Sequence, residues 1–375
     1  MRPQAGSPVT EKSSAPKGNP PLSALREQVA ELRLRARVAQ AQPERLETLG
    51  CGRSAAVRIF DPDARPGSSL SAERDVRRRQ DELSKLLRER GPMRLIGAQT
   101  GEALAARIAK LHVSHPNFAA ATDYLLQEEI LARHQSKGLA GIRLLLHGGA
   151  GLGKTDYALH LAELIGLPTQ VIGFSSAQAS AALGGSETYW SNSEPGIVWK
   201  ELIQGDFANW VCVMDEIDKA DKRAGDPLGA LYQLLEERSA RIFTDKSVPW
   251  LPVDASHINW VATANHLDLI HPAILSRFTV VEAMELTFEQ RAQLAQRLYR
   301  QVVDEHGLQR KLSETLEDKA LEQLARGSVR DLKRILRQAV ATALRRGATR
   351  IEVSAETPAR AHARAIGFIR QGADR

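Results

Sequence analysis

Four short apolar runs alternate with helix-like segments in the middle of the chain, and this alternation predicts the fold. The runs lie at 142–146, 169–172, 210–214 and 258–263. Continuous apolar runs of this length are typical of strands that are buried on both faces of a parallel sheet. We therefore predict an α/β domain of three layers, in which a parallel sheet lies between two layers of helices.

Helices are expected on both sides of this region. Apolar residues at helical spacing predict four helices before it. These lie at 23–42, 71–91, 101–113 and 117–134. After residue 286 the strand pattern stops, and capping-box patterns at Thr287 and Ser328 open further helices. The C-terminal part is therefore predicted to be helical.

Two stretches near the N-terminus lack such patterns. Residues 1–22 are rich in Pro, Ser, Lys and Gly and have few apolar anchors, which predicts a disordered tail. Residues 49–70 contain several Gly and Pro residues and are expected to form a loop or linker.

The composition indicates a globular protein and excludes several classes. The two cysteines, Cys51 and Cys212, are too few for a disulfide framework or a zinc site, and Cys212 lies in an apolar run where a thiol is usually a core residue. No apolar run approaches the roughly 20 residues of a membrane span, and the N-terminus lacks the apolar region of a signal peptide. We therefore expect no membrane contact and a location in the reducing cytoplasm.

The positive charge lies in the N-terminal part of the chain. Residues 1–91 contain 18 Lys and Arg against 12 Asp and Glu, which accounts for the whole net charge of +6. Such an excess can bind nucleic acid or an acidic partner. The alternative is a solvated helix surface, and we favour it because the two signs are interspersed.

A glycine-rich segment after the first apolar run carries the strongest candidate chemistry. Its pattern is Gly-x-x-x-x-Gly-Lys-Thr, between an expected strand and an expected helix. Glycines let the backbone N–H groups surround phosphates, and the helix N-terminus adds positive potential. We expect Lys154 to contact the β- and γ-phosphates and the Thr155 hydroxyl to bind Mg²⁺. The predicted nucleotide-binding residues are Gly148, Gly149, Ala150, Gly151, Leu152, Gly153, Lys154 and Thr155.

Polar residues follow the third and fourth apolar runs. Asp215 and Glu216 end the third run, and the carboxyl ends of parallel strands meet at the edge where the phosphate loop lies. We assign Asp215 to the nucleotide and Mg²⁺, and Glu216 to the attacking water. Asn265 follows the fourth run and is expected to orient the same water, although Asn also commonly serves turns.

Two arginines complete the candidate catalytic set. Arg277 precedes a strand-like segment at 279–282, and Arg330 lies in the first turn of an expected helix. Alone, either is more often a surface residue, but with the other motifs both are expected to place positive charge near phosphate. His112 and His115 lie three residues apart, but a third ligand is missing, so we do not predict a metal there.

Together these motifs resemble an AAA+ ATPase, and more closely the ATPase module of the Lon family, over about residues 115–345. In that family's terms the glycine-rich loop is Walker A. The other matching motifs are Walker B at 211–216, sensor 1 at 262–265, an arginine finger at 276–278 and sensor 2 at 327–332. The resemblance implies a P-loop NTPase fold. The expected parts are a disordered tail (1–22), an arginine-rich helical extension (23–114), an AAA+ α/β nucleotide-binding domain (115–285) and a C-terminal helical lid with a tail (286–375).

The resemblance also implies a mode of action. ATP and Mg²⁺ would bind at the interface of a homo-oligomeric ring, most simply a hexamer, with Arg277 acting on a neighbouring subunit. Tyr189 occupies the place of the aromatic that grips polypeptide in related unfoldases, and Trp190 follows it. The alternative is that both aromatics pack against their own domain.

We therefore expect ATP hydrolysis coupled to remodelling or threading of a protein substrate. The Lon protease domain has no counterpart in the sequence, so no protease activity is expected. One alternative is a nucleic-acid-associated AAA+ ATPase, such as a loader or a component of a mobile element or defence system, that uses residues 23–91. Another is a non-catalytic scaffold that senses nucleotide, which the complete catalytic set disfavours.

Overall fold

The computed structural model describes most of the chain. The described residues are 22–41, 55–65, 74–135, 137–175, 179–186, 193–220, 228–327 and 329–353. The predicted disordered tail, apart from Leu22, lies outside them, as do Tyr189, Trp190 and Ser328.

A five-stranded parallel sheet forms the centre of the molecule, in the order β4-β5-β6-β3-β7. Its strands are β3 (Arg143–His147), β4 (Thr169–Gly173), β5 (Val211–Asp215), β6 (Asn259–Ala264) and β7 (Thr279–Glu282). The four apolar runs all form strands, and the predicted α/β fold is confirmed. Strand β6 is buried along its whole length because it lies in the middle of the sheet. A mostly apolar run is the pattern that such a position favours, and the two polar residues of β6, Asn259 and Thr263, are hydrogen-bonded.

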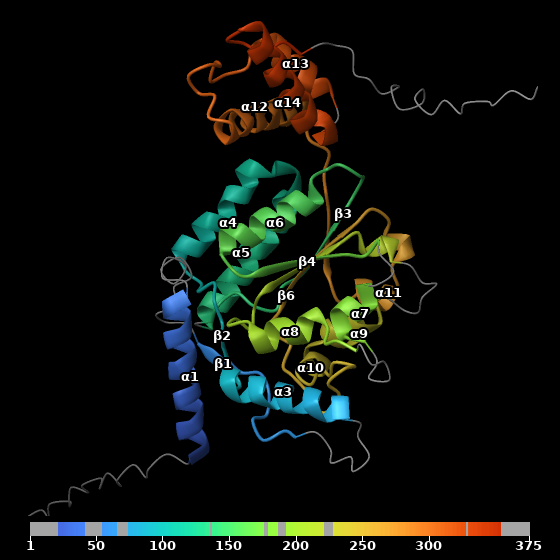
Figure 1. Cartoon of the computed structure of the whole chain (residues 1–375). Helices are drawn as coiled ribbons and strands as arrows, with labels where there is room; N and C mark the ends of the chain where they lie inside the picture. The colour runs from blue at the N-terminus through green and yellow to red at the C-terminus, as the bar shows by residue number, and fades with distance from the viewer. Residues whose placement is uncertain are drawn as a thin grey trace, which may run out of the picture.

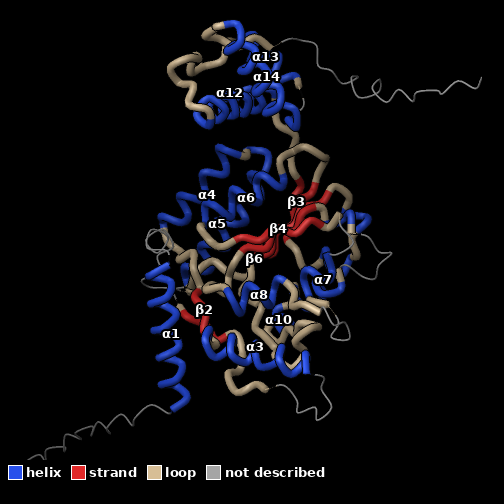
Figure 2. The backbone as a smooth tube through the Cα atoms, in the orientation of Figure 1, coloured by secondary structure: helices blue, strands red, loops and turns tan. Residues whose placement is uncertain are grey.

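Helices cover both faces of the sheet (Figures 1 and 2). One face carries α4 (Glu102–Ser114), α5 (Ala119–His134) and α6 (Lys154–Ile165), which share one hydrophobic cluster. The other face carries α8 (Ile197–Gln204), α9 (Gly229–Leu234) and α10 (Glu237–Ala240). The shorter elements are α7 (Ala179–Gly184), α11 (Pro272–Leu275), η2 (Pro116–Phe118), η3 (Ile217–Lys219) and η5 (Leu267–Leu269).

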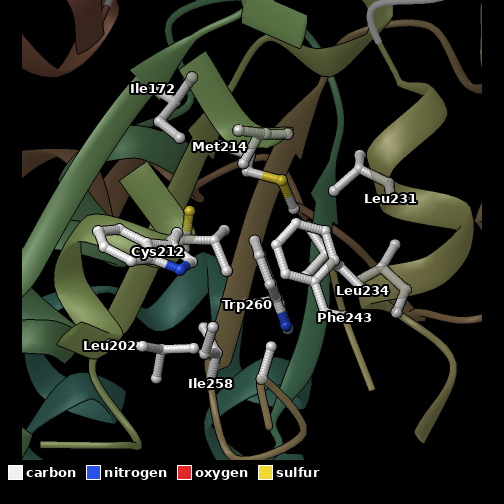
Figure 3. Packing of buried hydrophobic residues seen from close by; sticks show 14 of the residues in the cluster. Ile172, Leu202, Cys212, Met214, Leu231, Leu234, Phe243, Ile258 and Trp260 are labelled. Carbon is white, nitrogen blue, oxygen red and sulfur yellow. The ribbon is translucent and has the colours of Figure 1, made fainter. Parts of the chain in front are cut away.

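Large side chains fill the second face. Figure 3 shows Cys212 and Met214 of β5 beside Trp260 of β6, with Leu231 of α9 opposite. Cys212 is fully buried, and burial raises the pKa of its thiol above the ordinary range. It is therefore an unreactive core residue, as its place in an apolar run predicts.

The N-terminal extension packs against the sheet domain. It comprises α1 (Leu22–Ala41), β1 (Ala56–Arg58), α3 (Arg74–Arg90) and β2 (Met93–Leu95), and β1 pairs with β2 in antiparallel fashion. Strand β1 lies in the segment expected to be a loop, because three residues are too few to show a period of two. Phe60 and Leu87 belong to the same hydrophobic cluster as the sheet. The packing is thus continuous across residue 115, and the domain boundaries stay predictions.

Arginines attach this extension to the end of α8. The Arg94 side chain is fully buried and donates hydrogen bonds to the carbonyls of Leu202 (2.6 Å) and Ile203 (2.5 Å). Arg37 and Arg90 both bind Asp206, just beyond the helix. Cations are favourable at a helix C-terminus, where carbonyls lack partners. Three arginines of the basic extension therefore have a structural role.

The C-terminal helices form a separate hydrophobic cluster, which we call the lid. They are α12 (Phe288–Glu305), α13 (Asp318–Arg326) and α14 (Val329–Arg346). The predicted capping box is present at the start of α12, where Thr287 and Gln290 exchange hydrogen bonds. None of the helices that the structure describes is long and apolar enough to cross a lipid bilayer.

Candidate nucleotide site

A cavity of about 410 Å³ opens where the glycine-rich loop, the carboxyl ends of β5 and β6, and the lid meet. Cavities of roughly 300–1,000 Å³ are usual for small-molecule sites. Most of the predicted site residues line this cavity, although they are far apart in sequence. They are Ala150, Gly151, Leu152, Gly153, Lys154, Thr155, Asp215, Glu216, Asn265 and Arg330.

The loop has the backbone that its glycines allow. Gly148, Gly151 and Gly153 have φ values of 147°, 83° and 88°, in the region that other residues avoid. Helix α6 begins at Lys154 directly after Gly153, so its free N–H groups point towards the loop. A Cβ on Gly151 would lie 3.1 Å from the Cβ of Arg330 in the lid. The loop therefore also depends on glycine for its close approach to α14.

Lys154 is held inside the loop. Its Nζ donates hydrogen bonds to the carbonyls of Gly148 (2.7 Å) and Gly149 (2.8 Å) and to Oδ1 of Asn265 (2.8 Å). Burial lowers the pKa of Lys154, and the charge of Asp218 opposes this shift most strongly. The Lys154 ammonium group is partly shielded from water and lies close to the loop, so it is well placed to attract phosphate.

Asp215 receives two hydroxyl groups. Thr155 Oγ1 donates to Asp215 Oδ1 at 2.6 Å, and Thr263 Oγ1 donates to the same oxygen at 2.7 Å. Thr263 also accepts the backbone N–H of Glu216 at 2.9 Å. The sequence placed Thr263 in the sensor 1 motif and gave it no role. Its hydroxyl fixes both carboxylate residues to the neighbouring strand.

Glu216 leaves the strand by a sharp backbone turn. Its φ and ψ are 56° and 51°, a left-handed conformation that is uncommon for a residue with a side chain. Such strain is often retained where it aims a functional side chain. The carboxylate pairs with Lys219 Nζ at 2.5 Å.

Asp218 supports the turn that carries Asn265. Its Oδ2 accepts the backbone N–H groups of Asn265 (3.2 Å) and His266 (3.1 Å), while Oδ1 is buried without a hydrogen-bond partner. Only 7% of the residue is exposed. A buried carboxylate behind Lys154 and Asn265 stabilises the positive charge on one and the position of the other.

The two predicted arginines have different positions. Arg330 is exposed at the start of α14 and lines the cavity. Arg277 does not line the cavity of its own chain. Its guanidinium donates to the carbonyl of Ala273 (2.5 Å) and lies 5.8 Å from the ring centroid of Tyr232.

One part of the cavity wall was not predicted from the sequence. His115 and Asn117 line it, at the junction between α4 and α5. His115 Nε2 lies 2.9 Å from Asp156 Oδ2, and this hydrogen bond lowers the pKa of Asp156. Asn117 donates to the carbonyl of Leu152 at 2.9 Å. The sequence signal was His115 itself, which was considered only as a metal ligand.

Comparison with known proteins supports a Lon-like AAA+ module. Residues 143–278 match the family described as AAA domain (dynein-related subfamily). The Lon protease of Desulfovibrio desulfuricans is 32% identical over 200 residues, 52% of this chain and 22% of that protein. The Lon protease of Amoebophilus asiaticus is 29% identical over 216 residues, 56% of this chain and 26% of that protein. This chain contains a Lon-like AAA+ module.

The fold of the AAA+ module also occurs in solved structures. The closed state of Hsp104 with ATPγS and casein superposes with a TM-score of 0.55 at 16% identity, covering 65% of this chain and 48% of that one. The S. cerevisiae Hsp104–casein complex in its extended conformation gives a TM-score of 0.53 at 17% identity. Identities this low show a shared fold. The chain spans about a quarter of the length of the two Lon proteases, 26% and 22%.

Proposed function

We propose that this protein hydrolyses ATP and uses the energy to remodel a protein substrate. The observation that carries the proposal is the convergence on one cavity of a cradled lysine, a hydroxyl–carboxylate pair and a second carboxylate. These are Lys154, Thr155 with Asp215, and Glu216. In-line transfer of a phosphoryl group to water depends mainly on positioning and electrostatic stabilisation.

Each residue has a distinct task in this proposal. Lys154 and the loop N–H groups bind the β- and γ-phosphates, and Asn265 orients the attacking water. Glu216 takes the proton of that water, after its carboxylate leaves Lys219. Arg330 contacts the nucleotide from the lid, so lid position follows the state of the nucleotide.

The same residues fit Mg²⁺. Thr155 and Asp215 bring one hydroxyl and one carboxylate oxygen together beside the loop, and Mg²⁺ takes few protein oxygens, with phosphates and waters as its other ligands. Among the described residues no cluster of three or more His, Cys, Asp or Glu side chains offers a metal cage. Thr155 and Asp215 would therefore hold Mg²⁺, which neutralises charge on the phosphates.

Glu216→Gln tests the chemistry. This variant keeps the shape of the side chain and loses the base, so we expect ATP binding near that of the wild type and turnover reduced at least about 100-fold. Turnover is measured by phosphate release and binding by titration with a fluorescent ATP analogue. Normal turnover in Glu216→Gln would refute the assignment.

We propose a homo-oligomeric ring, a hexamer by analogy with Lon, in which Arg277 serves the neighbouring cavity. Its absence from the cavity of its own chain supports this. Arg277→Ala is expected to bind ATP and to lose turnover by about 1,000-fold. A mixture of the Arg277→Ala and Glu216→Gln chains should recover activity. In the mixed ring the Glu216→Gln chain supplies an intact Arg277 to a cavity of the Arg277→Ala chain, which keeps an intact Glu216. If the mixture is no more active than its parts, Arg277 does not act in trans.

A polypeptide is the proposed substrate, gripped by Tyr189 and Trp190 in the ring pore. Support comes from the sequence likeness to Lon and from the fold shared with Hsp104 in complexes with casein. Unfolded casein should raise the ATPase rate of the wild type, and Tyr189→Ala should abolish that increase while retaining basal turnover. Proteolysis is not part of this proposal, and casein is expected to stay at full length.

The described residues offer no observation that favours the nucleic-acid alternative. Arg37, Arg90 and Arg94 of the basic extension bind other parts of this chain. Arg35 and Arg78 pair with acidic residues one helical turn away. Binding of DNA that weakens with salt would revive this alternative. The cytoplasmic location stays a prediction.

A further inference from the structure

The ring of Tyr232 lies beside the arginine predicted to act in trans. The Arg277 guanidinium carbon is 5.8 Å from the ring centroid, within the range of a cation–π contact. His271, at the other end of the same segment, meets the ring edge-on with centroids 5.8 Å apart and an interplanar angle of 75°. One aromatic ring on α9 thus contacts both ends of the segment 271–277.

Tyr232 is anchored more firmly than Arg277. It lies between Leu231 and Leu234 in sequence, both fully buried, and its own ring packs against the same core cluster as Leu275. Both side chains are partly buried, so the difference lies in their contacts and flexibility. The long arginine side chain has many rotamers, and it donates a hydrogen bond to a backbone carbonyl within its own segment. The ring is therefore the fixed surface and the guanidinium the adjustable part.

We infer that Tyr232 is a positioning residue that holds the Arg277 guanidinium ready for a neighbouring subunit's nucleotide. This inference rests on the proposed trans role of Arg277. An arginine used on developing phosphate charge is most effective when its direction is set before the reaction. The face of an aromatic ring sets that direction without neutralising the charge, which a carboxylate partner would do.

Three variants test the inference, with kcat and KM for ATP measured by phosphate release on the full chain. Tyr232→Ala removes the ring and is expected to lower kcat about tenfold, with KM unchanged within about twofold. Tyr232→Phe keeps the ring face and should restore kcat to within about twofold of the wild type. Gln233→Ala removes the neighbouring side chain of the same helix, which donates to the carbonyl of Ile242 rather than contacting the segment 271–277. It is the matched control and should leave both constants unchanged.

A double variant separates positioning from general damage. If Tyr232 acts through Arg277, then Tyr232→Ala combined with Arg277→Ala is no slower than Arg277→Ala alone, because the effects of coupled residues do not add. Mixing Tyr232→Ala with Glu216→Gln should also recover turnover, since the first chain keeps an intact cavity and the second an intact arginine. A misfolded Tyr232→Ala chain would show no such recovery.

The outcomes distinguish the positioning role of Tyr232 from the trans role of Arg277. Additive losses in the double variant, or failure of Tyr232→Phe to restore kcat, overturn the role of Tyr232 and leave the trans role of Arg277 standing. Normal turnover in Arg277→Ala overturns the trans role itself, and the inference falls with it. A large loss in Arg277→Ala with normal kcat in Tyr232→Ala refutes only the positioning role.

Discussion

Replacement of Arg94 by leucine should weaken the fold more than any change of an exposed arginine. Arg94 is fully buried and donates four hydrogen bonds to main-chain carbonyls. These belong to Gly91 and Met93 on its own side, and to Leu202 and Ile203 at the end of α8. Leucine retains part of the apolar volume and provides no donor, so the carbonyls at this helix end lose their partner.

The expected loss follows from those contacts. Each buried carbonyl left without a donor costs about 1–3 kcal/mol. Relief of the desolvated charge offsets part of this, because burial and the nearby Arg90 and Arg37 lower the pKa of Arg94 to about 9. We expect a net loss of about 3–4 kcal/mol, in the range found when one partner of a buried charged contact is removed. For a folding unit of this size that corresponds to a fall in Tm of roughly 6–16 °C.

Thermal and urea unfolding followed by circular dichroism measure this loss. Arg78→Leu is the matched control, since the Arg78 side chain is 81% exposed and pairs with Glu82 on the same helix. It should change stability by less than about 0.5 kcal/mol. If Arg94→Leu costs less than about 1 kcal/mol, the carbonyls find other partners and the extension is not held through Arg94.

Three further predictions concern the site. Asp218→Ala leaves the N–H groups of Asn265 and His266 without their acceptor and should lower ATP turnover about tenfold or more. Asp218→Asn keeps an acceptor oxygen and should lose less turnover. Equal losses of turnover in the two variants would contradict this reasoning. Gly151→Ala meets both a positive φ and the lid, so strain of about 1–2 kcal/mol should weaken binding of a fluorescent ATP analogue, and unchanged affinity would show that the loop tolerates a side chain. Lys154 is charged below its pKa, and burial lowers that pKa, so ATP affinity should fall at a less alkaline pH than the ordinary lysine value of 10.5 predicts. An arginine at this position should remove the pH dependence of ATP affinity. An ATP affinity of the wild type that stays constant from about pH 7 to 10 would argue against this reasoning.

The features that sequence predicts best here are those set by neighbours along the chain. The buried strands and the start of α6 follow from local apolar runs and from Gly153 before Lys154. The position of Asp215 and Glu216 beside the glycine-rich loop follows from the rule that parallel strands end at one edge, and both residues line the cavity. Their Mg²⁺ and water roles stay predictions.

The missed features depend on contacts between distant segments. Thr263 of β6 reaches Asp215 at the end of the adjacent strand β5, and Asp218 reaches the turn after β6. The sequence patterns assign no role to Arg94, and its partners Leu202 and Ile203 lie more than 100 positions away. No periodic pattern in the sequence predicts such contacts, because each depends on how the layers of helices and strands pack against one another.

Arg297 of α12 donates hydrogen bonds to the carbonyls of Val113 and Ser114, the last turn of α4. These carbonyls adjoin His115 on the cavity wall. These hydrogen bonds connect the lid to the cavity wall, and the chain between β7 and α12 is the covalent connection of the lid to the sheet. Any swing of the lid must either break these hydrogen bonds or drag the wall with it. As long as these hydrogen bonds hold, a movement of the lid and a change in the shape of the cavity occur together.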